Sequence, residues 1–139
     1  MFMKKYTGFT LIELMVVVVI IGVLALLGLR LYLTQIAKSN NALIKANAGT
    51  VQTTIQGDLA DADPAAVEAD WIATTLVDRT GIHNPLDKQP QALAPVTFAG
   101  AGAGEVYVIY DASDAIFYIN GKDAAGTADV YTTPLVAKY

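Results

Sequence analysis

One acidic side chain, Glu13, stands inside a long apolar stretch, and its position is the strongest chemical signal in the chain. The stretch covers residues 9–29, Glu13 is its only charged residue, and the next charge is Arg30. A carboxylate inside such a segment costs on the order of a few kcal/mol, so one found there usually has a partner or a function. Its chemistry would be charge pairing, because a buried anion needs a cation or hydrogen-bond donors.

Conventional catalytic residues are scarce. His83 is the only imidazole, it lies beside Asn84 and Pro85 in a predicted loop, and the chain has no cysteine. A Ser-His-acid arrangement would depend on that single histidine, and a lone loop histidine is more often a solvated or capping side chain. The sequence therefore predicts no enzyme activity and no cofactor.

Aspartate clusters raise the alternative of a calcium site in the exported part of the chain. Turn and capping chemistry is the favoured interpretation, so we expect no metal site. The residues concerned are Asp58, Asp61 and Asp63 in one segment and Asp111, Asp114 and Asp123 in another.

The apolar stretch is long enough to cross a membrane. As a helix, residues 9–29 would span roughly 30 Å, the thickness of a bilayer's hydrocarbon core. Lys4 and Lys5 precede the stretch, which predicts a cytoplasmic start and export of the rest of the chain. A conventional secretory signal would have a shorter apolar core and an A-x-A-like cleavage site. The element that positions Glu13 is thus a membrane-spanning helix behind a short basic leader.

The residues around the acid form the motif Gly8-Phe9-Thr10-Leu11-Ile12-Glu13-Leu14. With the basic leader before it and the apolar run after it, this segment resembles the cleavage and assembly motif of type IV pilin and pseudopilin precursors. The resemblance implies that a prepilin peptidase cuts between Gly8 and Phe9 and methylates the new amino terminus on Phe9. The detailed match ends near Arg30.

Cleavage after Gly8 would place a cationic amine on Phe9, one helical turn from Glu13. The two charges could pair within a subunit or between staggered subunits, and such pairing sets register more than raw stability. The family uses this acid between subunits, which implies that role for Glu13. Many pilins carry a proline near the end of the run, whereas this chain has Gly22 and Gly28, each weakening a helix by ~1 kcal/mol relative to alanine. We expect any unwinding in a filament between these glycines.

Composition predicts one small exported domain without a disulfide. The chain has 139 residues, a net charge of −4 and no cysteine. Losing Lys4 and Lys5 with the leader lowers the side-chain charge to −6, which argues against nucleic-acid binding, because phosphate recognition needs clustered Lys and Arg. Without a disulfide, the exported domain must be stabilised by packing, by neighbouring subunits in a filament or by a bound ion.

The long helix is predicted to continue in amphipathic form and to end near Gly57, where glycine and several acids follow. Its inward residues would be Leu33, Ala37, Ile44, Ala48, Val51, Ile55 and Leu59. A second helix would start at Asp63 and Pro64, a good N-cap and first-turn pair, and would cover residues 65–78 up to a stop at Gly81. Its inward residues would be Val67, Trp71 and Leu76.

Short alternating segments predict three or four antiparallel strands. The candidates are residues 96–99, 105–110, 115–119 and 130–136, the last with Pro134 favouring an edge. On one face or the other they would bury Tyr107, Ile109, Ile116 and Tyr118. The aromatic residues Tyr107, Tyr110, Phe117, Tyr118 and Tyr131 are expected to pack rather than to form an exposed adhesive surface. The predicted fold class is α+β, with a long N-terminal helix packed against a small antiparallel sheet.

These inferences divide the chain into a leader (residues 1–8), a long helix (residues 9–57) and a globular head (residues 58–139). Residues 9–29 would be the transmembrane segment and the filament core. The predicted protein is a structural subunit of a type IV pilus, the major pilin, held in the cytoplasmic membrane as a precursor and then assembled into an extracellular filament. Its partners would be its own copies, the lipid bilayer, prepilin peptidase and the pilus assembly machinery.

Two alternatives stay open at this point. A pseudopilin of a type II secretion or DNA-uptake machine would share the N-terminal motif but form a short periplasmic filament. A monomeric membrane-anchored binding protein would share only the apolar segment. Motility, adhesion, DNA uptake and electron transfer are equally compatible with the residues.

Overall fold

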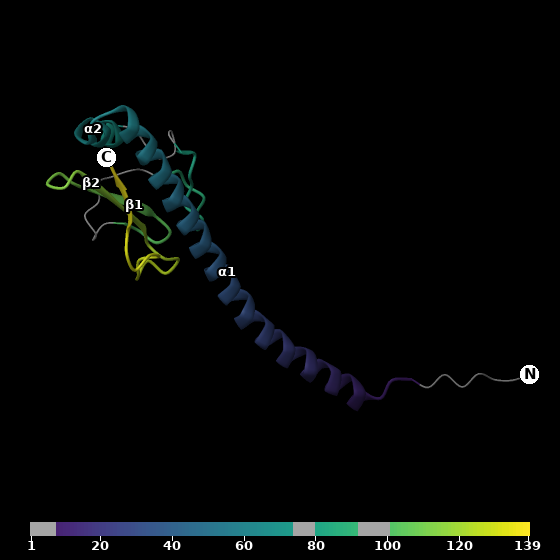
Figure 1. The fold of residues 1–139 in the computed structure, drawn as a ribbon. Helices are drawn as coiled ribbons and strands as arrows, with labels where there is room; N and C mark the ends of the chain where they lie inside the picture. Colours follow the sequence, from purple (N-terminus) through teal and green to yellow (C-terminus); the bar gives the residue numbers. More distant parts are fainter. Residues whose placement is uncertain (1–7, 74–79, 92–100) are drawn as a thin grey trace, which may run out of the picture. The chain divides into compact units, whose positions relative to one another are not determined.

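The computed structural model describes residues 8–73, 80–91 and 101–139, and this part of the chain contains two helices and three strands (Figure 1). In chain order they are α1 (Leu11–Asp61), α2 (Pro64–Ala73), β1 (Val106–Asp111), β2 (Ile116–Gly121) and β3 (Leu135–Lys138). The chain separates into two compact units, Met1–Ile36 and Ala37–Tyr139. The first contains the apolar part of α1, and the second contains the rest of α1, α2 and the sheet.

Helix α1 continues one turn past its predicted end at Gly57 and ends at Asp61. A glycine costs a helix about 1 kcal/mol relative to alanine, but Leu59 lies beyond it and is only 2% exposed. Burying a leucine contributes roughly 1.5–3 kcal/mol, which outweighs the glycine. The helix stops close to Asp63, because a residue that precedes proline is driven out of the helical conformation.

The buried stripe of α1 lies wholly in the second unit. Its members are Ile44, Ala48, Val51, Ile55 and Leu59, all of them predicted. Leu33 and Ala37 continue the same period but are exposed. The helical period in the sequence thus identified the buried face of α1. The rest of the fold covers that face only from Ile44 onward.

Helix α2 has the predicted start, because Asp63 immediately precedes it and accepts a hydrogen bond from the Val67 N–H through its carbonyl oxygen at 3.0 Å. The predicted inward residues Val67 and Trp71 are buried. The rest of the predicted helix, with Leu76, lies outside the described residues, as does the strand candidate at residues 96–99.

Strands β1, β2 and β3 form one antiparallel sheet in that order. The register pairs Val108 with Ile119 and Phe117 with Ala137. Strand β2 begins one residue later than predicted because Ala115 has φ of +54°, a turn conformation in which the strand cannot start.

The last strand is shorter than predicted. It begins at Leu135, directly after Pro134, and not at residue 130. Val130 instead donates its backbone N–H to the Gly121 carbonyl oxygen at 2.8 Å, so its hydrogen bond lies outside the ladder. Strand β3 is at an edge of the described sheet, as the proline indicated.

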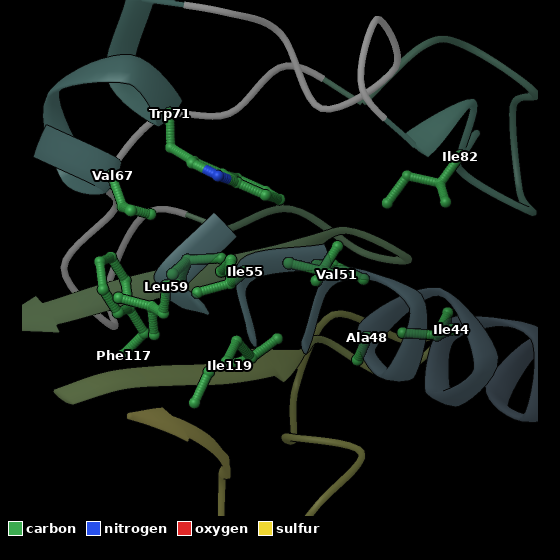
Figure 2. Close-up of a cluster of buried hydrophobic side chains, with 13 residues drawn as sticks. Ile44, Ala48, Val51, Ile55, Leu59, Val67, Trp71, Ile82, Phe117 and Ile119 are labelled. Carbon is green, nitrogen blue, oxygen red and sulfur yellow. The ribbon is translucent and has the colours of Figure 1, made fainter. Parts of the chain in front are cut away.

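The core of the second unit lies between α1, α2 and one face of the sheet (Figure 2). The sheet contributes Val106, Val108, Phe117, Ile119 and Ala137, each at most 6% exposed. Tyr107 alternates onto the other face and is also buried. The remaining residues predicted to be buried are half-buried: Ile109, Ile116 and Tyr118.

Four of the five aromatic rings of the sheet region are packed as predicted, namely Tyr107, Tyr110, Phe117 and Tyr131, and Tyr118 is half-buried. The Tyr110 and Phe117 ring centroids lie 4.6 Å apart, and Tyr131 packs against the core cluster. Phe117 belongs to the core and Tyr107 is buried on the other face of the sheet, both 2% exposed, so neither ring lies on an open surface.

Candidate assembly site

Thr10 and Glu13 form a closed hydrogen-bonded pair at the start of α1. The Glu13 Oε2 atom accepts hydrogen bonds from the Thr10 backbone N–H at 2.9 Å and from the Thr10 hydroxyl at 2.7 Å. The Thr10 Oγ1 atom accepts one in turn from the Glu13 backbone N–H at 3.3 Å. This reciprocal arrangement is a capping box, in which two residues satisfy helix donors that would otherwise have no partner.

Sequence reasoning gave Thr10 no role, although the signal was present. A threonine followed three residues later by glutamate, just before an apolar helix, is the signature of a capping box. The box holds the Glu13 carboxylate at the helix N-terminus, where the helix dipole favours negative charge. Phe9 precedes the box and is 84% exposed. A shallow apolar hollow is lined by both predicted pairing residues and their neighbours: Phe9, Ile12, Glu13, Val16 and Val17.

The helix beyond this site presents a continuous apolar surface. Every described residue from 8 to 39 is exposed, including large side chains such as Leu14 and Ile20. Among the described helices, α1 is the one long and apolar enough to cross a membrane. Soluble monomers rarely expose apolar patches beyond a few hundred Å², so this surface needs a covering of lipid or of other protein.

Gly22 and Gly28 lie within this apolar surface. A Cβ atom built on either residue would meet no side chain and no other part of the chain within 4 Å, apart from its own turn of helix backbone. Helix α1 is continuous through both glycines in the single chain. The expected unwinding concerns a filament, so for these two residues it stays a prediction.

Two aspartates of the candidate calcium clusters, Asp111 and Asp123, cap turns. Asp111 accepts hydrogen bonds from the Ser113 hydroxyl at 2.6 Å and the Ser113 N–H at 2.9 Å, and these bonds hold the pKa of Asp111 below its ordinary value. Asp123 accepts from the N–H groups of Ala128 and Thr127, which lowers the pKa of Asp123 in the same way. Within the described ranges, no three acidic, histidine or cysteine side chains are grouped to hold a metal ion.

Two other candidate residues, His83 and Asp58, make hydrogen bonds within the chain. His83 is exposed, and its Nδ1 atom lies 3.0 Å from the Gly81 carbonyl oxygen. Gly81 has φ of +68°, the left-handed conformation expected of a helix stop. Asp58 accepts a hydrogen bond from the indole N–H of the buried Trp71 at 2.6 Å.

Comparisons with known proteins relate this chain to a family model and to several curated fimbrial proteins. Residues 3–29 match the family model described as the prokaryotic N-terminal methylation motif. The chain is 33% identical over 125 residues to the type IV major fimbrial protein FimA of Dichelobacter nodosus, covering 86% of this chain and 74% of the relative. It is 43% identical over 58 residues to the fimbrial protein EcpB of Eikenella corrodens, covering 42% and 36%. It is 44% identical over 59 residues to a probable minor fimbrial protein of Dichelobacter nodosus, covering 42% and 37%. No solved structure matches the chain significantly.

A methylation motif on an exposed apolar helix, followed by a small α+β unit, defines a class of filament subunits. The similarity to FimA extends well beyond the motif, over most of both chains, whereas the other two matches span less than half of each relative. The chain therefore belongs to the type IV fimbrial protein, or type IV pilin, family. The predicted family, fold class and filament-subunit function are confirmed.

Proposed function

We propose that this chain is the major subunit of a type IV pilus, inserted first in the cytoplasmic membrane and then assembled into a filament on the cell surface. Prepilin peptidase removes residues 1–8 by cutting between Gly8 and Phe9, and the new Phe9 amine is methylated. The pilus assembly machinery moves the subunit from lipid into a filament of identical copies. The role is structural and involves no catalysis. The similarity to a major fimbrial protein over most of its length supports the choice of a major subunit.

The placement of the Glu13 carboxylate carries this proposal. It stands at the start of an exposed apolar helix, accepts two hydrogen bonds from Thr10 and lines one hollow with Phe9. A carboxylate offers about four acceptor sites, so these bonds leave room for a cation. Cleavage supplies that cation as the Phe9 amine of a neighbouring copy. In low-dielectric surroundings, the pair fixes the stagger between adjacent subunits.

The apolar surface of residues 9–29 suits both of the environments that the subunit occupies. Lipid already removes these side chains from water, so their transfer to a filament core is nearly an exchange of one apolar contact for another. The helix loosens between Gly22 and Gly28 in the filament. Residues 58–139 supply the exported head.

Substitutions of Glu13 separate assembly from anchoring. Glu13→Gln keeps an acceptor for Thr10 but removes the charge, so the chain should still insert and be processed while surface filaments are lost. Asp111→Asn makes the same charge change in the second unit and should assemble normally. The measurement is electron microscopy of sheared surface fibres, with mass spectrometry of the mature N-terminus, which should be methylated Phe9.

Three outcomes would contradict this proposal. Wild-type filament yield from Glu13→Gln would eliminate the charge pair. Wild-type chains found only in short periplasmic assemblies would identify a pseudopilin. A chain that begins at Met1 and remains monomeric would identify a membrane-anchored binding protein.

A further inference from the structure

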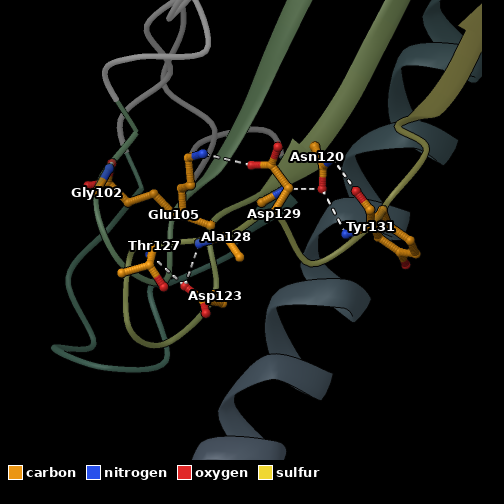
Figure 3. A network of polar contacts seen from close by, with 10 residues as sticks. Gly102, Glu105, Asn120, Asp123, Thr127, Ala128, Asp129 and Tyr131 are labelled. Atoms are coloured by element: carbon orange, nitrogen blue, oxygen red, sulfur yellow. Dashed lines mark hydrogen bonds and ion pairs between the residues drawn. The ribbon is translucent and has the colours of Figure 1, made fainter.

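Asn120 closes the loop that follows β2 (Figure 3). Its Nδ2 atom donates to the Tyr131 carbonyl oxygen at 2.9 Å, and its Oδ1 atom accepts from the Tyr131 N–H at 3.1 Å. One side-chain amide thus pairs with both backbone groups of one residue, as a neighbouring strand would. Asparagine alone combines a donor and an acceptor at this length, because aspartate has no donor and glutamine is longer. Among the side chains of this length, asparagine is therefore the one that can make both of these bonds across the segment of residues 122–134, hereafter the closing loop.

Packing independently requires glycine at the next position. A Cβ atom on Gly121 would lie 2.5 Å from Ile44 Cγ2 and 3.3 Å from the Glu105 carbonyl oxygen. Ile44 is fully buried in the core, so it has little freedom to move away. Two unrelated structural demands thus place an Asn-Gly pair in the chain, and the sequence contains no other.

Asn-Gly is the dipeptide in which side-chain deamidation meets the least steric resistance. The glycine backbone nitrogen, after losing its proton to a base, attacks the asparagine Cγ atom. The C–N bond of the side-chain amide then breaks, and its NH2 group takes a proton from the protonated base and leaves as ammonia. The cyclic succinimide that results is opened by water at either carbonyl, which gives aspartate or isoaspartate. No oxidant, reductant or enzyme takes part.

We infer that Asn120–Gly121 is a masked deamidation site, protected only while the closing loop is closed. In the closed state, the Asn120 Oδ1 atom accepts from the Gly121 N–H at 2.8 Å as well as from Tyr131, so the side chain is held and the attacking nitrogen keeps its proton. Asn120 is 1% exposed, which excludes the water and base that the reaction needs. Opening of the loop removes both protections.

Deamidation of Asn120 would be chemically irreversible, and it would also prevent the closing loop from returning to its closed conformation. Aspartate at position 120 replaces a donor by a carboxylate that faces the Tyr131 carbonyl oxygen, so two acceptors would meet. Isoaspartate lengthens the backbone of β2 by one carbon after its Cα atom, which shifts Gly121 out of its pairing with Val106 of β1. A subunit whose closing loop stays open is therefore chemically prevented from closing again.

The test measures deamidation of Asn120 in the full chain in detergent micelles, at mildly alkaline pH, by peptide mass spectrometry. The rate should be at least about tenfold lower in the folded chain than in urea, because reaction requires local opening. A synthetic peptide of residues 115–123 should react as fast as the chain in urea. Equal rates in the folded chain and in urea would overturn the inference.

Two matched variants test whether loop closure provides the protection. Asp123→Ala removes the cap of Thr127 and Ala128 inside the closing loop and should raise the Asn120 rate several-fold. Asp111→Ala removes a similar cap in the other turn and should leave the rate at its wild-type value. No acceleration in Asp123→Ala, or equal acceleration in both variants, would refute loop-specific masking.

The irreversibility has its own test. Asn120→Asp mimics one product and should show faster hydrogen exchange at the Tyr131 amide, while the Ile55 amide in α1 keeps its protection if the core still forms. Wild-type protection at Tyr131 in this variant would contradict the claim that deamidation prevents closure.

Discussion

The Glu13 carboxylate lies 2.7 Å from the Thr10 hydroxyl oxygen, so the acid proposed to join neighbouring subunits is already engaged within its own chain. The two roles are compatible because the capping bonds use one carboxylate oxygen, Oε2. Thr10 is thereby a positioning residue for Glu13. A freely rotating Glu13 carboxylate would have to be ordered each time a neighbouring subunit is added. The capping bonds to Thr10 already fix its orientation before assembly.

Removing the threonine hydroxyl should loosen the first turn of α1. Thr10→Ala is expected to cost about 1 kcal/mol of helix-start stability, the usual value of an N-cap, and to lower filament yield without affecting membrane insertion. Hydrogen exchange at the Glu13 amide in detergent should become several-fold faster. Thr10→Ser keeps the hydroxyl and should behave like wild type. If Thr10→Ala retains wild-type exchange and assembly, the box does not position the acid.

The C-terminal strand should be loosened by removing two glutamines of α1. Gln52 and Gln56 donate to the carbonyl oxygens of Val136 and Lys138, each at 2.8 Å. Gln52→Ala and Gln56→Ala should each lower the free energy of unfolding by about 0.5–1.5 kcal/mol, the net value of a hydrogen bond. Urea denaturation in detergent measures this change, and hydrogen exchange over β3 localises it. Thr53→Ala is the control, since its hydroxyl bonds only to its own helix in the described structure.

Two glycines should respond to alanine in opposite directions. Gly121→Ala inserts a methyl group against Ile44 and should destabilise the second unit by about 1–3 kcal/mol, as overpacking does. Gly57→Ala adds a methyl group in open space within a helix and should stabilise it by about 0.5–1 kcal/mol. Thermal unfolding of the detergent-solubilised chain distinguishes them. A stabilised Gly121→Ala would show that Ile44 gives way.

Asp58→Ala should change the environment of the only tryptophan. The Asp58 carboxylate accepts the Trp71 indole N–H at 2.6 Å, and losing that acceptor should cost about 1–3 kcal/mol of stability. Trp71 emission should shift in wavelength or intensity in the folded state. The nearby Asp61→Ala is the control for lost charge, and its spectrum should match wild type. Identical spectra and stabilities for both variants would show that the bond contributes nothing.

The contribution of Asp123 should vanish in acid. Hydrogen bonds from the Ala128 and Thr127 amides lower its pKa below the ordinary value of 3.8. A depressed pKa stabilises the fold above pH 3.8, and this stabilisation is lost as the pH falls through the lowered value. The stability difference between wild type and Asp123→Ala should therefore hold from neutral pH down to near pH 3.8 and then shrink progressively as the pH falls through the lowered pKa. Urea midpoints against pH measure it, with Asp114→Ala as the control for net charge. A difference that persists in acid would assign the effect to something other than the carboxylate.

The N-terminal motif was readable from the sequence because its information is local. Gly8, Phe9 and Glu13 lie within six consecutive residues. The apolar run that follows them is best explained as a membrane-spanning helix. The capping box is equally local, because Thr10 and Glu13 are three residues apart and both lie in the motif. The buried stripe of α1 from Ile44 to Leu59 was also predictable, since a helical period repeats without reference to the rest of the fold.

Tertiary structure decided what depends on partners distant in sequence. Helix α1 continues past Gly57 because burial of Leu59 in the core contributes more than the glycine costs the helix. The residues around Gly57 alone do not reveal that Leu59 will be buried. Asn120 pairs with Tyr131 across a loop, and no helical or strand periodicity relates the two positions. Glycine is needed at position 121 because Ile44, far away in the sequence, packs against it. A sequence therefore determines directly what neighbouring residues can settle among themselves. Where two distant surfaces compete for the same space, only the folded packing settles the outcome.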